Sequence, residues 1–212
     1  MKLPTNGAYT FRQLQEATES RKEKFPDLIF PEKALERDKW LAELIEHKKK
    51  IVRQVRKQEE IPVERIVQAF LMLVFFASSR KICVQEVITK GYPGKCVYCG
   101  DCPCTCTNPG VPRPLFRMKG NHPPKLKQSF GAFQASDWRV YPNDRSFEAK
   151  LIRALHLSEE GDEWTIEFLR NSEEKKIVEE MGDFLERLIS LASTFEINLA
   201  REVAYFFNRH AK

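Results

Sequence analysis

The sequence lacks the apolar segments that direct a protein into or across a membrane. Residues 1–24 contain no continuous apolar run, so the apolar core of a secretory signal peptide is missing. The most apolar segment, residues 66–77 (IVQAFLMLVFFA), is shorter than the roughly 20 residues that a bilayer-spanning helix needs. We therefore expect a cytoplasmic protein without a membrane partner, in which residues 66–77 form a helix buried on nearly all sides.

Strand patterns are also missing. The chain shows no alternation of β-branched and polar residues, whereas apolar residues recur at the spacing typical of helices. Ser172 precedes two glutamates and is expected to cap the helix that begins at Glu173. The sequence therefore predicts an all-α protein. Helices are expected at residues 11–24, 33–57, 63–79, 84–89, 133–141, 146–169, 173–195 and 199–209.

Charge is distributed unevenly along the chain. Residues 147–212 contain 9 Lys/Arg and 14 Asp/Glu, whereas residues 1–146 contain 26 Lys/Arg and 16 Asp/Glu. A basic segment can lie against RNA, DNA or an acidic partner, although positive charges spread over helical faces more often serve solvation alone. Charge by itself therefore does not decide between these functions.

Cysteine and proline are concentrated in one segment. Six of the twelve prolines fall within residues 102–128, a density that excludes a regular helix, so we expect a connector at residues 93–128. Five of the six cysteines lie in this connector, and in a reducing cytosol such clusters more often bind metal than form disulfides. We expect structural Zn²⁺ here, with free thiols on a loop as the alternative. The expected ligands are Cys96, Cys99, Cys104 and Cys106, with Cys102 competing for a place.

Acidic residues occur at helical spacing in two successive predicted helices. Glu159, Glu160 and Glu163 lie in the first, and Glu180 and Asp183 repeat the three-residue step in the second. Residues three apart share a helix face, so the two sets face one another if the helices are antiparallel. Clustered carboxylates repel one another unless a cation neutralises them, and oxygen ligands suit Mg²⁺ or Mn²⁺. A carboxylate that the metal does not fully engage, Glu163 or Glu180, is a candidate general base.

A solvated acidic surface is the alternative interpretation, because further glutamates lie nearby. The apolar pattern favours a site instead, since Glu180 and Asp183 border the apolar stripe of their helix and do not oppose it. That stripe consists of Ile177, Met181, Phe184, Leu185, Leu188 and Ile189.

The segments HLSEEGDEWTIEFL and IVEEMGDFLERLISLASTFEINL resemble the paired acidic helices of the MazG-like, all-α nucleoside triphosphate pyrophosphohydrolases. The resemblance covers residues 130–209. It implies a Mg²⁺-dependent four-helix bundle, usually dimeric, that hydrolyses (d)NTPs to (d)NMP and pyrophosphate. It assigns Glu159, Glu160 and Glu163 to the first motif and Glu180 and Asp183 to the second. Family members often continue with Leu-Ala-Asn, whereas this chain has Leu191, Ala192 and Ser193, which puts a substrate contact at that position in doubt.

The two halves of the chain share weak sequence matches in the same order. FRQLQEATESRKEKFPD corresponds to FGAFQASDWRVYPND, and ASSRKICVQEV corresponds to ASTFEINLAREV. These matches favour a degenerate tandem repeat over the chance likeness of two helical hairpins. Residues 1–92 are then the degenerate copy, 93–128 the connector and 129–212 the catalytic copy. Arg65 and Gln68 stand where Glu180 and Asp183 are expected, so the first copy lacks metal ligands and can act as the second half of an intrachain pseudo-dimer.

Other residues are candidates for contact with the substrate. Lys150 and Arg153 are positioned to bind phosphate if their helix lines the site, and Trp138 could stack on a base. Two alternative functions stay open. One is a zinc-stapled helical module that binds nucleic acid or a partner, and the other is a catalytically silent nucleotide sensor. A homo-oligomer is compatible with each of them.

Overall fold

A computed structural model describes residues 2–31, 33–61, 63–92, 102–103, 127–140 and 145–210. Within these ranges the chain forms eight α-helices, one 3₁₀ helix and no strand, which confirms the all-α prediction. None of the helices described is both long and apolar enough to cross a bilayer. The helices are α1 (Phe11–Glu19), the 3₁₀ helix η1 (Lys22–Lys24), α2 (Ala34–Arg56), α3 (Val63–Ser79), α4 (Val84–Gly91), α5 (Phe130–Val140), α6 (Phe147–Leu169), α7 (Glu174–Thr194) and α8 (Leu199–His210).

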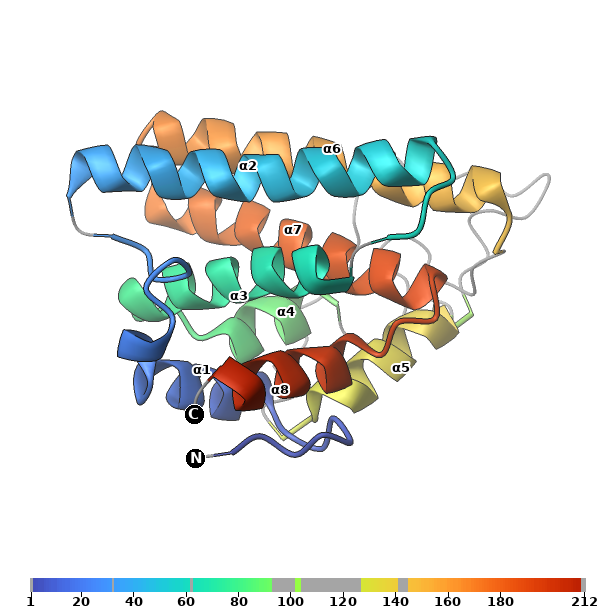
Figure 1. Cartoon of the computed structure of the whole chain (residues 1–212), viewed down its shortest axis with the longest axis horizontal. Helices are drawn as coiled ribbons and strands as arrows, with labels where there is room; N and C mark the ends of the chain where they lie inside the picture. The colour runs from blue at the N-terminus through green and yellow to red at the C-terminus, as the bar shows by residue number, and fades with distance from the viewer. Residues whose placement is uncertain are drawn as a thin grey trace.

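The long helices stack in layers. Helices α2 and α6 lie side by side at the top of Figure 1, α2 also packs on α3, α6 on α7, and α3 on α7. The shorter helices α1, α4, α5 and α8 lie below α3 and α7 in this view. Helix α4 follows α3 in sequence but packs on α7, while α8 follows α7 but packs on α3. The segments on either side of the connector are therefore interleaved.

One hydrophobic core joins both segments. Every residue from Ile66 to Ala77 except Gln68 is buried, as expected from its apolar run. Aromatic rings from three helices meet at its centre, where Phe76 lies 5.3 Å from Trp164 and 6.3 Å from Trp40, measured between ring centroids. This aromatic contact fixes α2, α3 and α6 against one another.

Two glutamines make the same pair of hydrogen bonds in the two halves of the chain. Gln15 of α1 donates through Nε2 to the carbonyl of Ile82 (2.8 Å) and accepts from the amide of Val84 (2.8 Å), which ties α1 to the loop between α3 and α4. Gln134 of α5 donates to the carbonyl of Ile197 (2.7 Å) in the loop between α7 and α8, and accepts from the amide of Leu199 (3.0 Å), the first residue of α8. Each glutamine thus secures the loop that turns the chain toward the neighbouring half.

The ends of the long helices also match. Left-handed residues follow α2 and α6 at the same distance, Gln58 with φ 58° and Asn171 with φ 52°. Lys81 and Glu196 are likewise left-handed and stand at this same distance after α3 and α7, with φ 58° and 60°. A residue in this conformation lets the following amides bond back to the last helical carbonyls, which ends the helix. Non-glycine residues seldom adopt this conformation. Its recurrence two residues after each of the four long helices is therefore a structural similarity between the two halves of the chain.

The prediction that Ser172 caps α7 is wrong. Helix α7 begins at Glu174, with Glu173 at the N-cap, and no side chain caps it. The hydroxyl of Ser172 instead donates to Glu167 Oε2 at 2.6 Å, and Glu167 also accepts from Lys176 at 2.8 Å. Ser172 therefore fastens the end of α6, a role that its position before two glutamates did not indicate.

Replacing Gly182 with alanine is expected to lower the free energy of unfolding by about 1–3 kcal/mol. A Cβ at this position of α7 would lie 2.7 Å from Cγ1 of Val87 in α4, and the β-branched valine has few rotamers with which to give way. Chemical denaturation of the two proteins measures the difference. Alanine in place of Lys175, an exposed residue of α7, is the control and should change stability by less than about 0.5 kcal/mol. Equal stability of all three proteins would show that α4 and α7 are less closely packed than described.

Candidate metal centre

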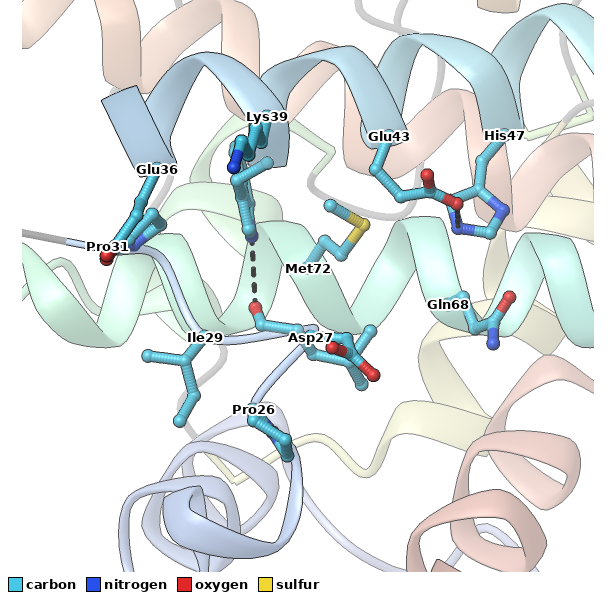
Figure 2. Close-up of a pocket in the computed structure, with 12 residues that line it drawn as sticks. Pro26, Asp27, Ile29, Pro31, Glu36, Lys39, Glu43, His47, Gln68 and Met72 are labelled. Carbon is cyan, nitrogen blue, oxygen red and sulfur yellow. Dashed lines mark hydrogen bonds and ion pairs between the residues drawn. The ribbon is translucent and has the colours of Figure 1, made fainter. Parts of the chain in front are cut away.

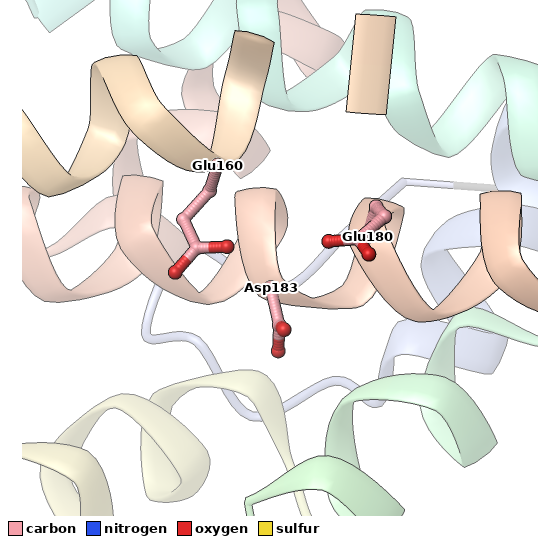
Figure 3. Close-up of side chains that lie close together, drawn as sticks. All are labelled: Glu160, Glu180 and Asp183. Atoms are coloured by element: carbon pink, nitrogen blue, oxygen red, sulfur yellow. The ribbon is translucent and has the colours of Figure 1, made fainter. Parts of the chain in front are cut away.

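Three of the predicted carboxylates converge between α6 and α7. One oxygen from each of Glu160, Glu180 and Asp183 can be chosen so that all three lie within 4.8 Å of one another. Figure 3 shows Glu160 extending from α6 toward α7, with the carboxylate of Glu180 directed toward it and Asp183 beside them. All three side chains are partly buried. The expected antiparallel pairing of the two acidic motifs is therefore present in the fold.

A glycine lets the two helices come close at this point. Gly161 follows Glu160 and is buried, and a Cβ there would lie 3.1 Å from the ring of Phe184 and 2.6 Å from Cδ of Lys48. The buried Lys48 in turn bonds to Asp162 and to the carbonyl of Ser158. The carboxylate of Glu160 is thus carried by a segment held closely against both α7 and α2.

Two residues that the sequence did not indicate hold the carboxylates. Tyr92, just after α4, donates its hydroxyl hydrogen bond to Asp183 Oδ1 at 2.8 Å. Arg187 of α7 donates from Nε to Glu160 Oε1 at 3.5 Å. Arg187 lies seven residues after Glu180 on nearly the same helix face, a spacing that could have pointed to it. Tyr92 is distant in sequence and carries no comparable signal.

The geometry fits a small divalent cation. Oxygen ligands lie about 2.1 Å from Mg²⁺, which places neighbouring ligands about 3–4 Å apart. The three donor atoms, within 4.8 Å of one another, need to move together by only about 1 Å. Three carboxylates also leave positions for water and phosphate oxygens, which Mg²⁺ prefers to retain. Glu160, Glu180 and Asp183 are therefore the residues that would hold the ion.

Burial raises the pKa of Glu180 above its ordinary value, and the negative charges of Glu163 and Asp183 add to the effect. A carboxyl group with a raised pKa favours the fold in its protonated form. Without metal, this contribution is present at low pH and is lost as the pH rises through the raised pKa. A cation bound at the three carboxylates would remove the penalty by neutralising the charge.

Metal affinity is expected to fall in acid because protons and metal compete for Glu180. Below the raised pKa of Glu180, the affinity for Mg²⁺ or Mn²⁺ should weaken by about tenfold per pH unit. Mn²⁺ titrations followed by calorimetry at a series of pH values test this. In Glu180→Gln, binding should be weaker throughout and should lose that part of its pH dependence. Affinity independent of pH down to the ordinary range of glutamate, in the unmodified protein, would contradict the assignment.

The other two predicted ligands lie outside the converging group. Glu159 and Glu163 are exposed on α6. The charge of Glu163 is nonetheless close enough to raise the pKa of Glu180. Glu163 is therefore a neighbour of the triad, and Glu159 has no part in it as described.

The predicted substrate contacts have other neighbours. Lys150 Nζ lies over the ring of Phe195, 4.8 Å from its centroid, and Trp138 lies beneath the guanidinium of Arg145 at 5.7 Å. The charge of Arg153 acts on the buried Asp137 of α5. The contacts given for these three residues are with Phe195, Arg145 and Asp137, and none is with Glu160, Glu180 or Asp183.

Ser193, which stands where the resembling family often has asparagine, belongs to the core. It is buried, donates to the carbonyl of Ile189 at 2.9 Å and accepts from Gln134 at 3.1 Å. These bonds give it a structural role in joining α5 to α7.

A second pair of carboxyl groups lies entirely inside the protein. Asp137 and Glu186 are 5% and 0% exposed. Burial, and then the charge of Glu186, raises the pKa of Asp137 well above its ordinary value. Glu186 forms an ion pair with Arg187, whose Nη1 lies 3.0 Å from Glu186 Oε2. Burial alone would lower the pKa of Arg187, but the carboxylates of Glu186, Glu160 and Asp183 outweigh it and raise that pKa.

The predicted zinc ligands Cys96, Cys99, Cys104 and Cys106 lie outside the described residues. Their competitor Cys102 is described and is exposed.

Comparison of the chain with protein-family models, with curated proteins and with solved structures gives no match.

Proposed function

We propose that this protein is a Mg²⁺-dependent hydrolase that converts nucleoside triphosphates to monophosphates and pyrophosphate. The observation that carries the proposal is the convergence of Glu160, Glu180 and Asp183 from two antiparallel helices. The resemblance of the two acidic motifs to MazG-like pyrophosphohydrolases supplies the reaction. Mn²⁺ is an alternative ion for the same oxygen ligands.

The side chains of the site have three roles: they bind the metal, orient a ligand and accept a proton. Bound Mg²⁺ would neutralise phosphate charge and make a water molecule more acidic. Glu160, Glu180 and Asp183 hold the ion, while Tyr92 fixes the orientation of Asp183 through its 2.8 Å hydrogen bond. Glu163 is exposed beside Glu180 and outside the triad, so it is free to accept a proton from the attacking water.

We further propose that the fold is a four-helix bundle, α2, α3, α6 and α7, made from two copies of one helical unit. The identical hydrogen bonds of Gln15 and Gln134 support this, as do the four left-handed residues at matching helix ends. The reciprocal packing of α4 on α7 and of α8 on α3 is the arrangement of a two-fold pseudo-dimer.

The proposed repeat pairs each carboxylate with a residue of the first half. Matching Gln58 to Asn171 pairs Glu160 with His47. Matching Lys81 to Glu196 pairs Glu180 with Arg65 and Asp183 with Gln68. Nη1 of Arg65 lies 3.4 Å from Nδ1 of His47, so the paired residues also meet in space. No carboxylate is left at these three positions, so one metal site per chain is proposed.

Incubation of the purified chain with each NTP and dNTP, with and without Mg²⁺, tests the function. The expected products are the monophosphate and pyrophosphate, identified by chromatography, and their formation should require the metal. A chelator should abolish turnover, and Mn²⁺ should restore it.

The alternative functions give different results in the same experiment. A nucleotide sensor would bind a triphosphate tightly without forming product. A nucleic-acid-binding module would retain RNA or DNA in a salt-dependent manner and would show no metal-dependent hydrolysis. Either outcome would overturn the hydrolase proposal.

A further inference from the structure

A separate cavity of about 530 Å³ lies on the first half of the chain, between residues 26–31 and helices α2 and α3 (Figure 2). Leu28, Trp40 and Met72 form its apolar part and are buried. Trp40 is held in place by its Nε1, which donates to the carbonyl of Leu28 at 3.1 Å. A volume of this size accommodates a small organic molecule.

The cavity occupies the place in the first half that corresponds to the carboxylate triad. His47 and Gln68, the partners of Glu160 and Asp183 in the proposed repeat, both line it. Met72 stands where the second half has Arg187. At three of these positions an imidazole, an amide and a thioether thus stand in place of charged groups, while Arg65 stands in place of Glu180.

Negative charge borders this cavity. Asp27, Glu36 and Glu43 line it together with one ammonium group, that of Lys39. Glu36 also lies 3.7 Å from the exposed Lys33, and Glu43 Oε1 lies 3.4 Å from Nε2 of His47. Figure 2 shows Glu43 beside His47, joined to it by a dashed line, with Asp27 lying apart from them and Met72 between.

His47 adds no compensating charge near pH 7. Its side chain is 4% exposed, and burial lowers its pKa, although the nearby Glu43 carboxylate acts in the opposite direction. The ring therefore serves as a neutral hydrogen-bonding group. An anionic ligand such as a nucleotide would meet the repulsion of Asp27 and Glu43.

A metal ion does not fit this position either. Among the described residues, the Glu160 group is the one set of three acidic, cysteine or histidine side chains whose donor atoms lie within 4.8 Å of one another. The cavity instead combines exposed carboxylates with a buried apolar floor. That combination suits a ligand with a charged end and an apolar body.

We propose that this cavity binds a small organic cation, with its ammonium or amidinium group at Asp27 and Glu43 and its apolar body against Leu28, Trp40 and Met72. The binding does not depend on the hydrolase activity proposed for the other half.

Three probes of similar shape and different charge test the proposal on the full chain. Benzylamine is cationic, benzyl alcohol is neutral and benzoate is anionic. Ligand-observed NMR and calorimetry should show benzylamine binding best and benzoate worst, and added salt should weaken only the binding of the amine. Equal binding of the three probes, or no binding of the amine, would overturn the proposal.

Matched variants locate the bound amine. Glu43→Gln and Asp27→Asn should each weaken benzylamine by about fivefold, whereas Glu23→Gln removes an exposed charge outside the cavity and should have no effect. Met72→Trp should fill the cavity and abolish binding if the variant remains folded by circular dichroism.

One further variant separates this site from the carboxylate triad. Glu180→Gln should leave the binding of benzylamine unchanged. Loss of binding in Glu180→Gln, with retention in Glu43→Gln, would place the amine at the triad and refute the proposal. Because the assay does not measure hydrolysis, absence of triphosphatase activity leaves this test valid.

Discussion

Replacing Asp183 with asparagine is expected to lower Mg²⁺-dependent pyrophosphate release by a factor of about 100 to 1,000. A catalytic metal contributes several kcal/mol to transition-state stabilisation, and each 1.4 kcal/mol corresponds to about tenfold in rate. Asparagine keeps the size of the side chain, and its oxygen can still accept the hydrogen bond that Tyr92 donates to Asp183. The substitution therefore removes the negative charge while retaining the local structure. Initial rates at saturating substrate over a range of Mg²⁺ concentrations measure the effect.

Glu159→Gln is the matched control, because Glu159 is an exposed residue of the same motif and lies outside the converging group. Its rate should stay within about threefold of the unmodified protein, since single surface charges have small effects. Thermal unfolding should be similar for both variants. Full activity in Asp183→Asn, or an equal loss in Glu159→Gln, would refute the assignment of the triad.

Replacing Arg187 with methionine is expected to lower the free energy of unfolding by about 3–5 kcal/mol. Glu186 is fully buried, and Nη1 of Arg187 lies 3.0 Å from its Oε2. This ion pair with Arg187 is therefore the main compensation for burying the Glu186 carboxylate. Removing the guanidinium leaves a buried carboxylate without its cation. Urea denaturation monitored by circular dichroism measures the loss.

A compensating variant distinguishes the charge effect from a packing effect. Arg187→Met combined with Glu186→Met should recover most of the lost stability, because neither charge then remains unpaired in the core. Arg201→Met is the surface control. Arg201 forms an exposed pair with Glu202 and should change the free energy of unfolding by less than about 0.5 kcal/mol. A loss below about 1 kcal/mol for Arg187→Met would contradict the stabilising role assigned to this ion pair.

Local patterns in the sequence predicted most helices of the described residues, but the helix expected at residues 11–24 ends at Glu19 and is followed by a 3₁₀ helix at Lys22–Lys24. The apolar spacing predicted each long helix to within a few residues, since a buried helix must present apolar side chains every three to four positions. Ser172 was misassigned because a serine before acidic residues is the usual cap signal. Here its hydroxyl is bound by Glu167 at the end of the preceding helix.

Convergence within the acidic motifs was only partly predictable. The spacing placed Glu160 opposite Glu180 and Asp183, but it gave no reason to separate Glu160 from Glu159 and Glu163. That distinction depends on how α6 is rotated against α7, which the contacts of Gly161 with Phe184 and Lys48 determine. The exposed fraction of each carboxylate follows from that rotation.

The sequence by itself determined the helical class of this protein, the two acidic motifs and the weak correspondence between the halves, because each is a property of residues near one another in the chain. Only the tertiary structure decided that Tyr92 and Arg187 hold the carboxylates, that Asp137 lies buried with Glu186, and that Asp27 and Glu43 border one cavity. These arrangements join helices from distant parts of the chain. Side-chain packing sets their relative positions, and that packing is not encoded in any local pattern.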